Sequence, residues 1–108
     1  MGIRASQITE EAFMKQVVQL AQLRGWRVAH FRAARTMKGW RTPGQFNAKG
    51  FPDLVLVRDR VIVAELKRTT KDEPSAEQLE WLRAFDGAGV ENHLWAPGDW
   101  AEIERILR

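Results

Sequence analysis

The segment GFPDLVLVRDRVIVAELKR constrains the fold more than any other part of the chain. Its two apolar runs, separated by a short polar stretch, predict a β-hairpin with strands at 53–57 and 61–67. Three charged residues interrupt this pattern: Asp53 opens the first predicted strand, and Glu65 and Lys67 lie at the end of the second. Because a buried charge costs several kcal/mol unless it is paired, we expect these three side chains to share one site.

The length of the hairpin turn decides whether Asp53 and Glu65 can meet. Side chains alternate between the two faces of a strand, so Glu65 and Lys67 share one face. A three-residue turn at 58–60 places Asp53 directly opposite Glu65, whereas a two-residue turn places it on the other face. A shared site therefore requires the odd-length turn, or an irregular start to the first strand.

The rest of the sequence predicts an α/β fold in a single domain, residues 1–108, with a mixed four-stranded sheet flanked by helices. The element order is α-β-β-β-α-β-α; the hairpin is antiparallel, and the final β-α-β unit implies a parallel pair. Residues 34–52 contain Gly and Pro without a clear period and are expected to form a long loop. The predicted elements are a helix at 9–25, strands at 26–33, 53–57 and 61–67, a helix from 75 to 87 or 89, a strand at 90–96 and a helix at 97–108.

Composition excludes several kinds of site and compartment. The chain has no cysteine, which excludes disulfides and thiolate metal sites. No apolar run approaches the roughly 18–20 residues of a membrane span, and the N-terminus lacks the apolar core of a signal peptide. We therefore expect a cytoplasmic protein without a membrane partner. The sequence also lacks a P-loop and a dinucleotide-binding fingerprint.

Basic residues are concentrated in one segment, although the formal net charge is only +3. Every charged residue between positions 24 and 50 is basic, which favours contact with nucleic acid; the alternative is a solvated basic loop. The same segment contains Trp40 and Phe46, which suit stacking on unpaired bases or, alternatively, pack the loop down. The candidate DNA-contacting residues are Arg32, Arg35, Lys38, Arg41 and Lys49.

The paired carboxylates Asp53 and Glu65 point to a hard divalent cation. Two carboxylates a few ångströms apart repel, so one of them keeps its proton unless a cation joins them. Mg²⁺ takes oxygen ligands, keeps several waters and can activate one of them for attack on phosphorus. Lys67 beside them can orient that water or neutralise charge on the phosphate. The alternative is a simple salt bridge between Lys67 and one of the acids at the sheet edge.

Two helices are expected to bring further polar groups to the same place. Glu10 continues the apolar stripe of Phe13 and Val17 and therefore faces the sheet, while Glu11 is turned about 100° away. The alternative for Glu10 is an acid that only stabilises the helix start. Gln78 lies on the inward face of the second long helix, but it also fits a capping box with the serine three residues earlier.

This set of residues resembles the PD-(D/E)XK nuclease superfamily and, within it, the VRR-NUC family. A PD…ExK pair alone is a weak pattern, but the preceding helix Glu and the downstream Gln make it specific. The resemblance covers nearly the whole chain apart from the first residues and the central loop, and it implies a restriction-endonuclease-like core. The residues that carry it are, in order, Glu10, Pro52-Asp53, Glu65-Leu66-Lys67 and Gln78. The matching stretches are TEEAF, VVQLAQLRGW, HFR, GFPDLVLV, VIVAELKR, PSAEQLEWL, AGVENHLWAPGDW and IERIL.

The resemblance implies a DNA endonuclease that depends on Mg²⁺ or Mn²⁺. Lys67 would position the water or stabilise the transition state, and Gln78 would support the site near Lys67 or contact the DNA backbone. His30 stays open between a general base, a phosphate contact and a structural role, since the metal–lysine arrangement needs no histidine base. The implied metal ligands are Asp53, Glu65, the carbonyl of Leu66 and, directly or through water, Glu10.

Free-standing members of this size resemble homodimeric nucleases of bacteria and phages that resolve Holliday junctions. The expected partner is therefore branched DNA, and the expected products carry 5′-phosphate and 3′-hydroxyl ends. Two other functions are compatible with the same sequence. One is a module that binds DNA junctions without cutting, and the other is a sequence-specific, restriction-type endonuclease.

Overall fold

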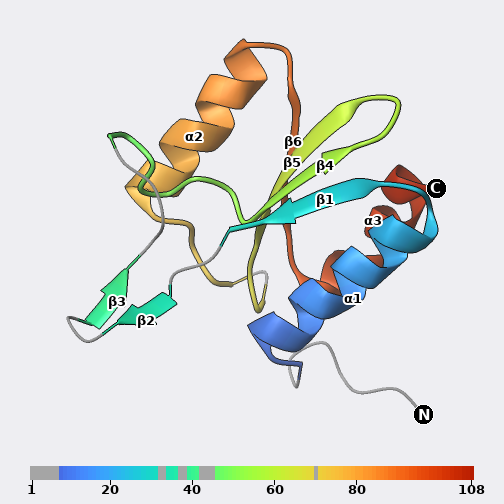
Figure 1. Cartoon of the computed structure of the whole chain (residues 1–108), viewed down its shortest axis with the longest axis horizontal. Helices are drawn as coiled ribbons and strands as arrows, with labels where there is room; N and C mark the ends of the chain where they lie inside the picture. Colours follow the sequence, from blue (N-terminus) through green and yellow to red (C-terminus); the bar gives the residue numbers. More distant parts are fainter. Residues whose placement is uncertain (1–7, 32–33, 37–38, 42–45, 70) are drawn as a thin grey trace.

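The computed structural model describes residues 8–31, 46–69 and 71–108, together with the backbone of 34–36 and 39–41. It contains the predicted four-stranded mixed sheet and three flanking helices, in the predicted order (Figure 1). None of the helices in these residues is long and apolar enough to cross a membrane. The elements are α1 (Glu10–Leu23), β1 (Arg27–His30), β2 (Ala34–Thr36), β3 (Gly39–Arg41), β4 (Leu54–Val57), β5 (Val61–Leu66), α2 (Ala76–Gly87), β6 (Glu91–Trp95), a 3₁₀ turn (Pro97–Asp99) and α3 (Trp100–Leu107).

The main sheet has the strand order β1-β4-β5-β6. Strand β4 pairs antiparallel with both β1 and β5, while β6 pairs with β5 in parallel. The parallel pair arises because α2 carries the chain from the end of β5 back to the start of β6, as the β-α-β pattern predicts. The predicted antiparallel hairpin and the predicted parallel pair are both confirmed.

The hydrophobic core lies between one face of the sheet and helices α1 and α3, with α2 on the other side of the sheet (Figure 1). Helix α1 contributes Phe13 and Val17, and α3 contributes Ile103 and Leu107; all four are fully buried. Each such side chain stabilises the fold by about 1.5–3 kcal/mol relative to exposure. The sheet residues in this core are Leu54, Leu56, Ile62, Ala64, Leu66 and Trp95.

The hairpin turn is anchored to the ends of α1 and α3 through two arginines. The guanidinium of Arg58 lies 4.4 Å from the ring centroid of Trp26, and that of Arg60 lies 5.2 Å from it. Arg58 also donates to the carbonyl oxygens of Arg24 and Arg108, at 3.0 and 3.1 Å. Cations are favourable beside the last carbonyls of a helix, so these contacts hold the turn and both helix ends in one arrangement.

The prediction of a loop throughout residues 34–52 was wrong. Strands β2 and β3 pair antiparallel in a separate two-stranded sheet, with Arg35 opposite Trp40. A strand of three residues is too short to show the two-residue period from which strands are predicted. The strand predicted at 26–33 is also shorter in the structure, where β1 ends at His30.

Candidate functional site

The hairpin register brings Asp53 and Glu65 opposite each other. Strand β4 ends at Val57 and β5 begins at Val61, so the turn has three residues, as a shared site requires. Val57 pairs with Val61 and Leu54 pairs with Ala64. Extending this register by one residue places Asp53 across from Glu65, on the same face of the sheet. The predicted odd-length turn is confirmed.

Asp53 is fixed by the end of the neighbouring strand. Its Oδ2 accepts a hydrogen bond of 2.9 Å from the backbone N–H of Leu66. Burial raises the pKa of Asp53 above its ordinary value, while the hydrogen bond from Leu66 and the nearby His30 and Lys67 act in the opposite direction. The Asp53 carboxylate is therefore held in place with one oxygen bonded to the protein backbone.

Glu65 is the one charged side chain of the described residues that is almost completely buried, at 2% exposure. Its Oε2 accepts a hydrogen bond from Nε2 of Gln78, but its Oε1 has no hydrogen-bond partner in the described part of the chain. Burial, and then repulsion from Asp53, raise the pKa of Glu65 from 4.5 to about 8. A buried carboxylate with a free oxygen beside a second carboxylate is a donor set that suits a divalent cation.

Gln78 connects Glu65 to Lys67. Its Nε2 donates to Glu65, and its Oε1 accepts from Nζ of Lys67 at 3.0 Å. The same Oε1 accepts from the backbone N–H of Ser75 at 2.8 Å, while Oγ of Ser75 accepts from the N–H of Gln78. The amide has separate donor and acceptor atoms, so the two sequence-based interpretations of Gln78, helix capping and site support, are geometrically compatible.

A simple salt bridge does not explain the position of the Lys67 ammonium group. Its Nζ lies 3.9 Å from Oε2 of Glu65, near the limit for an ion pair, and its closer contact is to the neutral Gln78 amide. Burial and the neighbouring Asp53 raise the pKa of Glu65 although Lys67 acts in the opposite direction, so attraction to Lys67 does not dominate the environment of this carboxyl. The ammonium group thus lies beside the carboxylates and is held more closely by Gln78 than by Glu65.

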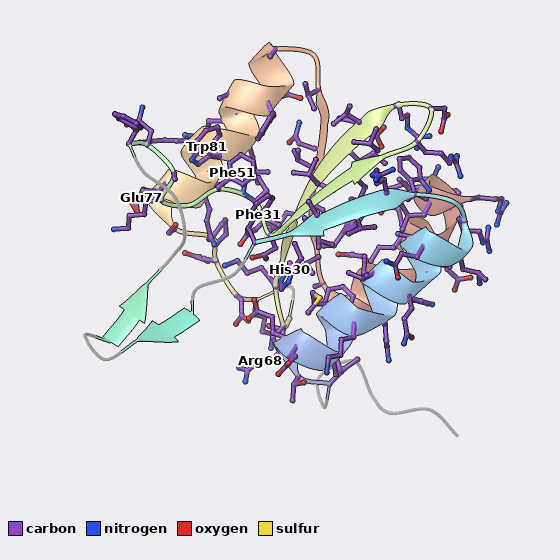
Figure 2. All side chains as sticks on the ribbon, viewed as in Figure 1. His30, Phe31, Phe51, Arg68, Glu77 and Trp81 are labelled. Atoms are coloured by element: carbon purple, nitrogen blue, oxygen red, sulfur yellow. The ribbon has the colours of Figure 1, made fainter. Side chains whose placement is uncertain are left out.

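Glu10 and His30 reach the same site from the other side. Both line a small cavity with Asp53, Leu66 and Met14, of about 10 Å³, close to the space that one water needs. Figure 2 shows His30 at the end of β1, near the first turn of α1. Of the two acids in the first turn of α1, Glu10 lines this cavity, whereas Glu11 pairs with Lys15 at 3.8 Å.

The position of His30 in this cavity is the feature that sequence reasoning missed. A single histidine in a strand carries no spacing signal, and the rough alternation of β1 did not fix the face that it occupies. The register of β1 against β4 would have revealed it, because His30 pairs with Leu54, next to Asp53.

The donor set fits magnesium better than metals that need a preformed protein cage. Within the described residues, no three His, Asp or Glu side chains converge closely enough to enclose an ion. Mg²⁺ is commonly held by one or two carboxylates while the remaining positions are waters. Asp53 and Glu65 meet that smaller requirement, since Oε1 of Glu65 has no partner among the described residues, and Glu10 lines the same small cavity as Asp53.

The predicted DNA-contacting residues are only partly covered by the structure. Arg32 and Lys38 lie outside the described residues, and for Arg35 and Arg41 only the backbone, in β2 and β3, is described. Lys49 is exposed, and its Nζ lies 3.6 Å from Oε1 of Glu77. The basic surface therefore stays a prediction.

Comparison with known proteins adds no relative to this picture: neither the scan against family models nor the search of curated proteins found a match for the sequence.

Proposed function

We propose that the protein is a Mg²⁺- or Mn²⁺-dependent DNA endonuclease of the PD-(D/E)XK type, similar to the VRR-NUC family. The observation that supports this proposal best is the pairing of Asp53 with the buried Glu65, whose Oε1 has no partner in the described residues. A pair of this kind destabilises the metal-free fold, since burial opposes ionisation of both acids. A cation bound between them would remove that cost.

Each residue of the site has a distinct part in the proposed reaction. Asp53 and Glu65 would hold the metal, and Glu10 would orient a water beside it. When bound, the metal would supply a water of lowered pKa and stabilise the negative charge that develops on the phosphate oxygens. Lys67, held by Gln78, neutralises negative charge on the scissile phosphate. Attack of the water oxygen on phosphorus breaks the bond to the 3′ oxygen, which leaves as a 3′-hydroxyl, and the phosphate stays on the 5′ end.

The substrate proposed is branched DNA, and the active form proposed is a homodimer. Two active sites related by a two-fold axis can cut two strands of a junction in a concerted way. The basic segment between positions 24 and 50 supplies the charge needed to approach a phosphate backbone.

The test is incubation of the purified protein with single-stranded, duplex, flap and four-way-junction DNA, with Mn²⁺ and then with excess EDTA. The proposal predicts cleavage of the branched substrates in Mn²⁺ and none in EDTA, with 5′-phosphate ends. Binding without cleavage under any divalent metal would instead identify a non-cleaving junction-binding module. Cleavage of plain duplex at a fixed sequence would identify a restriction-type enzyme.

The dual role of Gln78 gives a prediction that separates site support from helix capping. Ser75→Ala removes the capping hydrogen bond and should lower stability by about 1 kcal/mol, with cleavage unchanged. Gln78→Ala also releases Lys67 and Glu65, and should lower the cleavage rate by about 10–100-fold, as observed for residues that orient ligands. Urea unfolding and cleavage rates measure the two effects. Equal cleavage by the two variants would mean that Gln78 serves only as a cap.

A further inference from the structure

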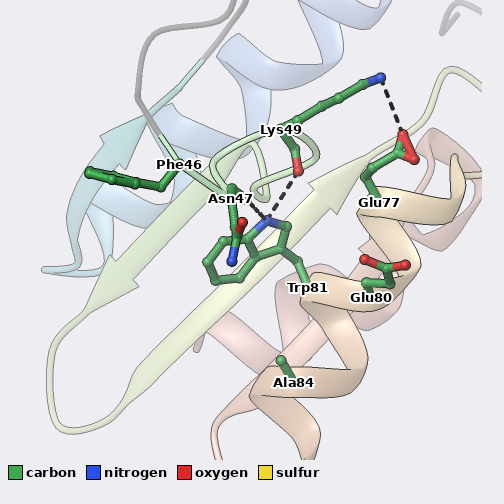
Figure 3. A pocket seen from close by; sticks show the side chains of 7 residues that line it. All are labelled: Phe46, Asn47, Lys49, Glu77, Glu80, Trp81 and Ala84. Atoms are coloured by element: carbon green, nitrogen blue, oxygen red, sulfur yellow. Dashed lines mark hydrogen bonds and ion pairs between the residues drawn. The ribbon is translucent and has the colours of Figure 1, made fainter.

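A second hollow lies on α2, the helix that carries Gln78. It has a volume of about 420 Å³ (Figure 3). Its helix wall includes Glu77, the residue before Gln78, and its loop wall runs through Lys49 toward Asp53. The pocket is therefore built from two segments that also carry residues of the proposed catalytic site. The residues that line it include Phe46, Asn47, Lys49, Glu77, Glu80 and Trp81.

The pocket is formed by a loop that is pinned onto the helix. Nε1 of Trp81 donates to the carbonyl oxygens of Asn47 and Lys49, at 2.9 and 3.1 Å (Figure 3). Gly50 has φ +84°, and a Cβ at this position would come within 2.5 Å of the Glu77 carbonyl carbon. Only glycine permits so close an approach in this backbone conformation. The pocket is therefore largely preformed, which lowers the entropy cost of binding.

Phe46 contributes nothing to the core, although it is a large aromatic residue. Its side chain is 99% exposed and extends away from the helix at one end of the pocket (Figure 3). Its φ of 60° is unusual for a residue with a side chain. Packing among the described residues therefore gives no reason for a phenylalanine at this position, whereas a stacking partner from outside the molecule does.

The polar groups around the pocket suit a planar ligand that carries N–H donors. Glu77 and Glu80 supply carboxylate acceptors, and Asn47 supplies an amide. Two carboxylates disfavour a phosphate inside the pocket. Lys49, with a side chain 82% exposed, pairs with Glu77 at 3.6 Å and reduces the negative charge at the rim. Aromatic stacking surfaces combined with acceptors are the groups that bind a nucleobase with an exocyclic amino group, as in carboxylate contacts to the N4 amino group of cytosine.

We infer that this pocket binds one unpaired, amino-bearing nucleobase of the DNA substrate, adjacent to the cleavage site. The inference rests on the proposed function, since it names the part of a branched substrate that the protein recognises. Branch points expose unpaired or unstacked bases, whereas an intact duplex does not. The pocket thus gives a physical basis for selecting distorted DNA over plain duplex.

The experiment measures equilibrium binding by fluorescence anisotropy in EDTA, so that no cleavage occurs. The probes are a short oligodeoxycytidine, an abasic oligonucleotide of the same length and a duplex of the same length. Phe46→Ala should weaken binding of oligodeoxycytidine about tenfold, the effect of removing one base-stacking partner. Binding of the abasic strand and the duplex should not change. Leu23→Ala, which removes another exposed apolar side chain (80% exposed) at the end of α1, is the matched control and should bind all three probes as the wild type does.

A second variant tests the acceptor role. Glu80→Ala should weaken binding of oligodeoxycytidine severalfold but not of oligodeoxythymidine, because thymine lacks an exocyclic amino group. Equal weakening of both strands, or an equal effect of Phe46→Ala on the abasic strand, would overturn the inference. A change from dimer to monomer in Phe46→Ala, without loss of single-strand affinity per chain, would also overturn it and make Phe46 part of a protein interface.

Parallel cleavage assays separate this inference from the proposed function. If the wild type cleaves branched DNA while Phe46→Ala binds single strands normally, only the pocket assignment fails. If binding depends on Phe46 but no DNA is cleaved with Mn²⁺, the pocket assignment holds as a base-binding site and the nuclease proposal fails.

Discussion

Asp53→Asn is expected to lower metal-dependent DNA cleavage by about 10³-fold, comparable to the loss of a key electrostatic group at an active site. Asparagine has nearly the same shape, and its carbonyl oxygen can still accept the 2.9 Å hydrogen bond from the N–H of Leu66. The fold should therefore persist while the negative charge that holds the metal is lost. Initial cleavage rates in Mn²⁺ measure the effect, and circular dichroism checks the fold.

Asp59→Asn is the matched control for this variant. Asp59 lies in the turn of the same hairpin, with its side chain 61% exposed and its carboxylate paired with Arg58 at 2.7 Å. Exposed ion pairs contribute little to stability, so its removal should leave the cleavage rate within about twofold of the wild type. A rate for Asp53→Asn equal to that of Asp59→Asn would mean that the metal site lies elsewhere.

The second large effect concerns the pH dependence of stability in the metal-free protein. Burial and the neighbouring Asp53 raise the pKa of Glu65 from 4.5 to about 8 in the folded state. Between these pH values the folded protein keeps a proton that the unfolded chain has lost, so unfolding releases a proton and rising pH favours it. The free energy of unfolding should therefore fall between about pH 5 and pH 8 by at least about 1.4 kcal/mol, the equivalent of one pKa unit.

Glu65→Gln should remove most of this fall, because glutamine is neutral at every pH of the series. It should therefore be more stable than the wild type at pH 8 when EDTA is present. Glu102→Gln, an exposed glutamate on α3 with a side chain 58% exposed, should retain the wild-type dependence. Urea unfolding across this pH range measures all three proteins. Wild-type stability that rises toward pH 8, or a Glu65→Gln curve parallel to the wild type, would contradict the assignment.

The geometry of the hairpin could be predicted from the sequence because side chains alternate between the two faces of a strand. The number of residues in the turn therefore decides which side chains of the two strands lie on the same face. The same kind of argument separates Glu10 from Glu11, since helical periodicity assigns each position a direction. Both predictions use only the regular spacing of side chains along one strand or one helix, which a few neighbouring residues define. Such regularity is enough to predict that Asp53 lies opposite Glu65 and that Glu10 faces the sheet.

Other features could not be predicted, because they depend on contacts between segments distant in sequence. The short strands β2 and β3 stabilise each other by pairing, and neither has a period of its own. Trp81 has the spacing of an ordinary core residue, yet its indole N–H holds the loop at Asn47. Within the described residues Oε1 of Glu65 has no hydrogen-bond partner, which follows from the packing around it and cannot be inferred from composition or spacing.

Calorimetric titration of Mn²⁺ into the wild-type protein at pH 7, in two buffers that differ in ionisation enthalpy, tests the proposed metal site. Binding at a defined site should be saturable. Because Glu65 has a pKa of about 8 without metal, binding should also release a proton to the buffer. Glu65→Gln should lose the proton release, and Asp53→Asn should bind far more weakly. Absence of saturable binding, or equal binding with equal proton release in all three proteins, would contradict the account.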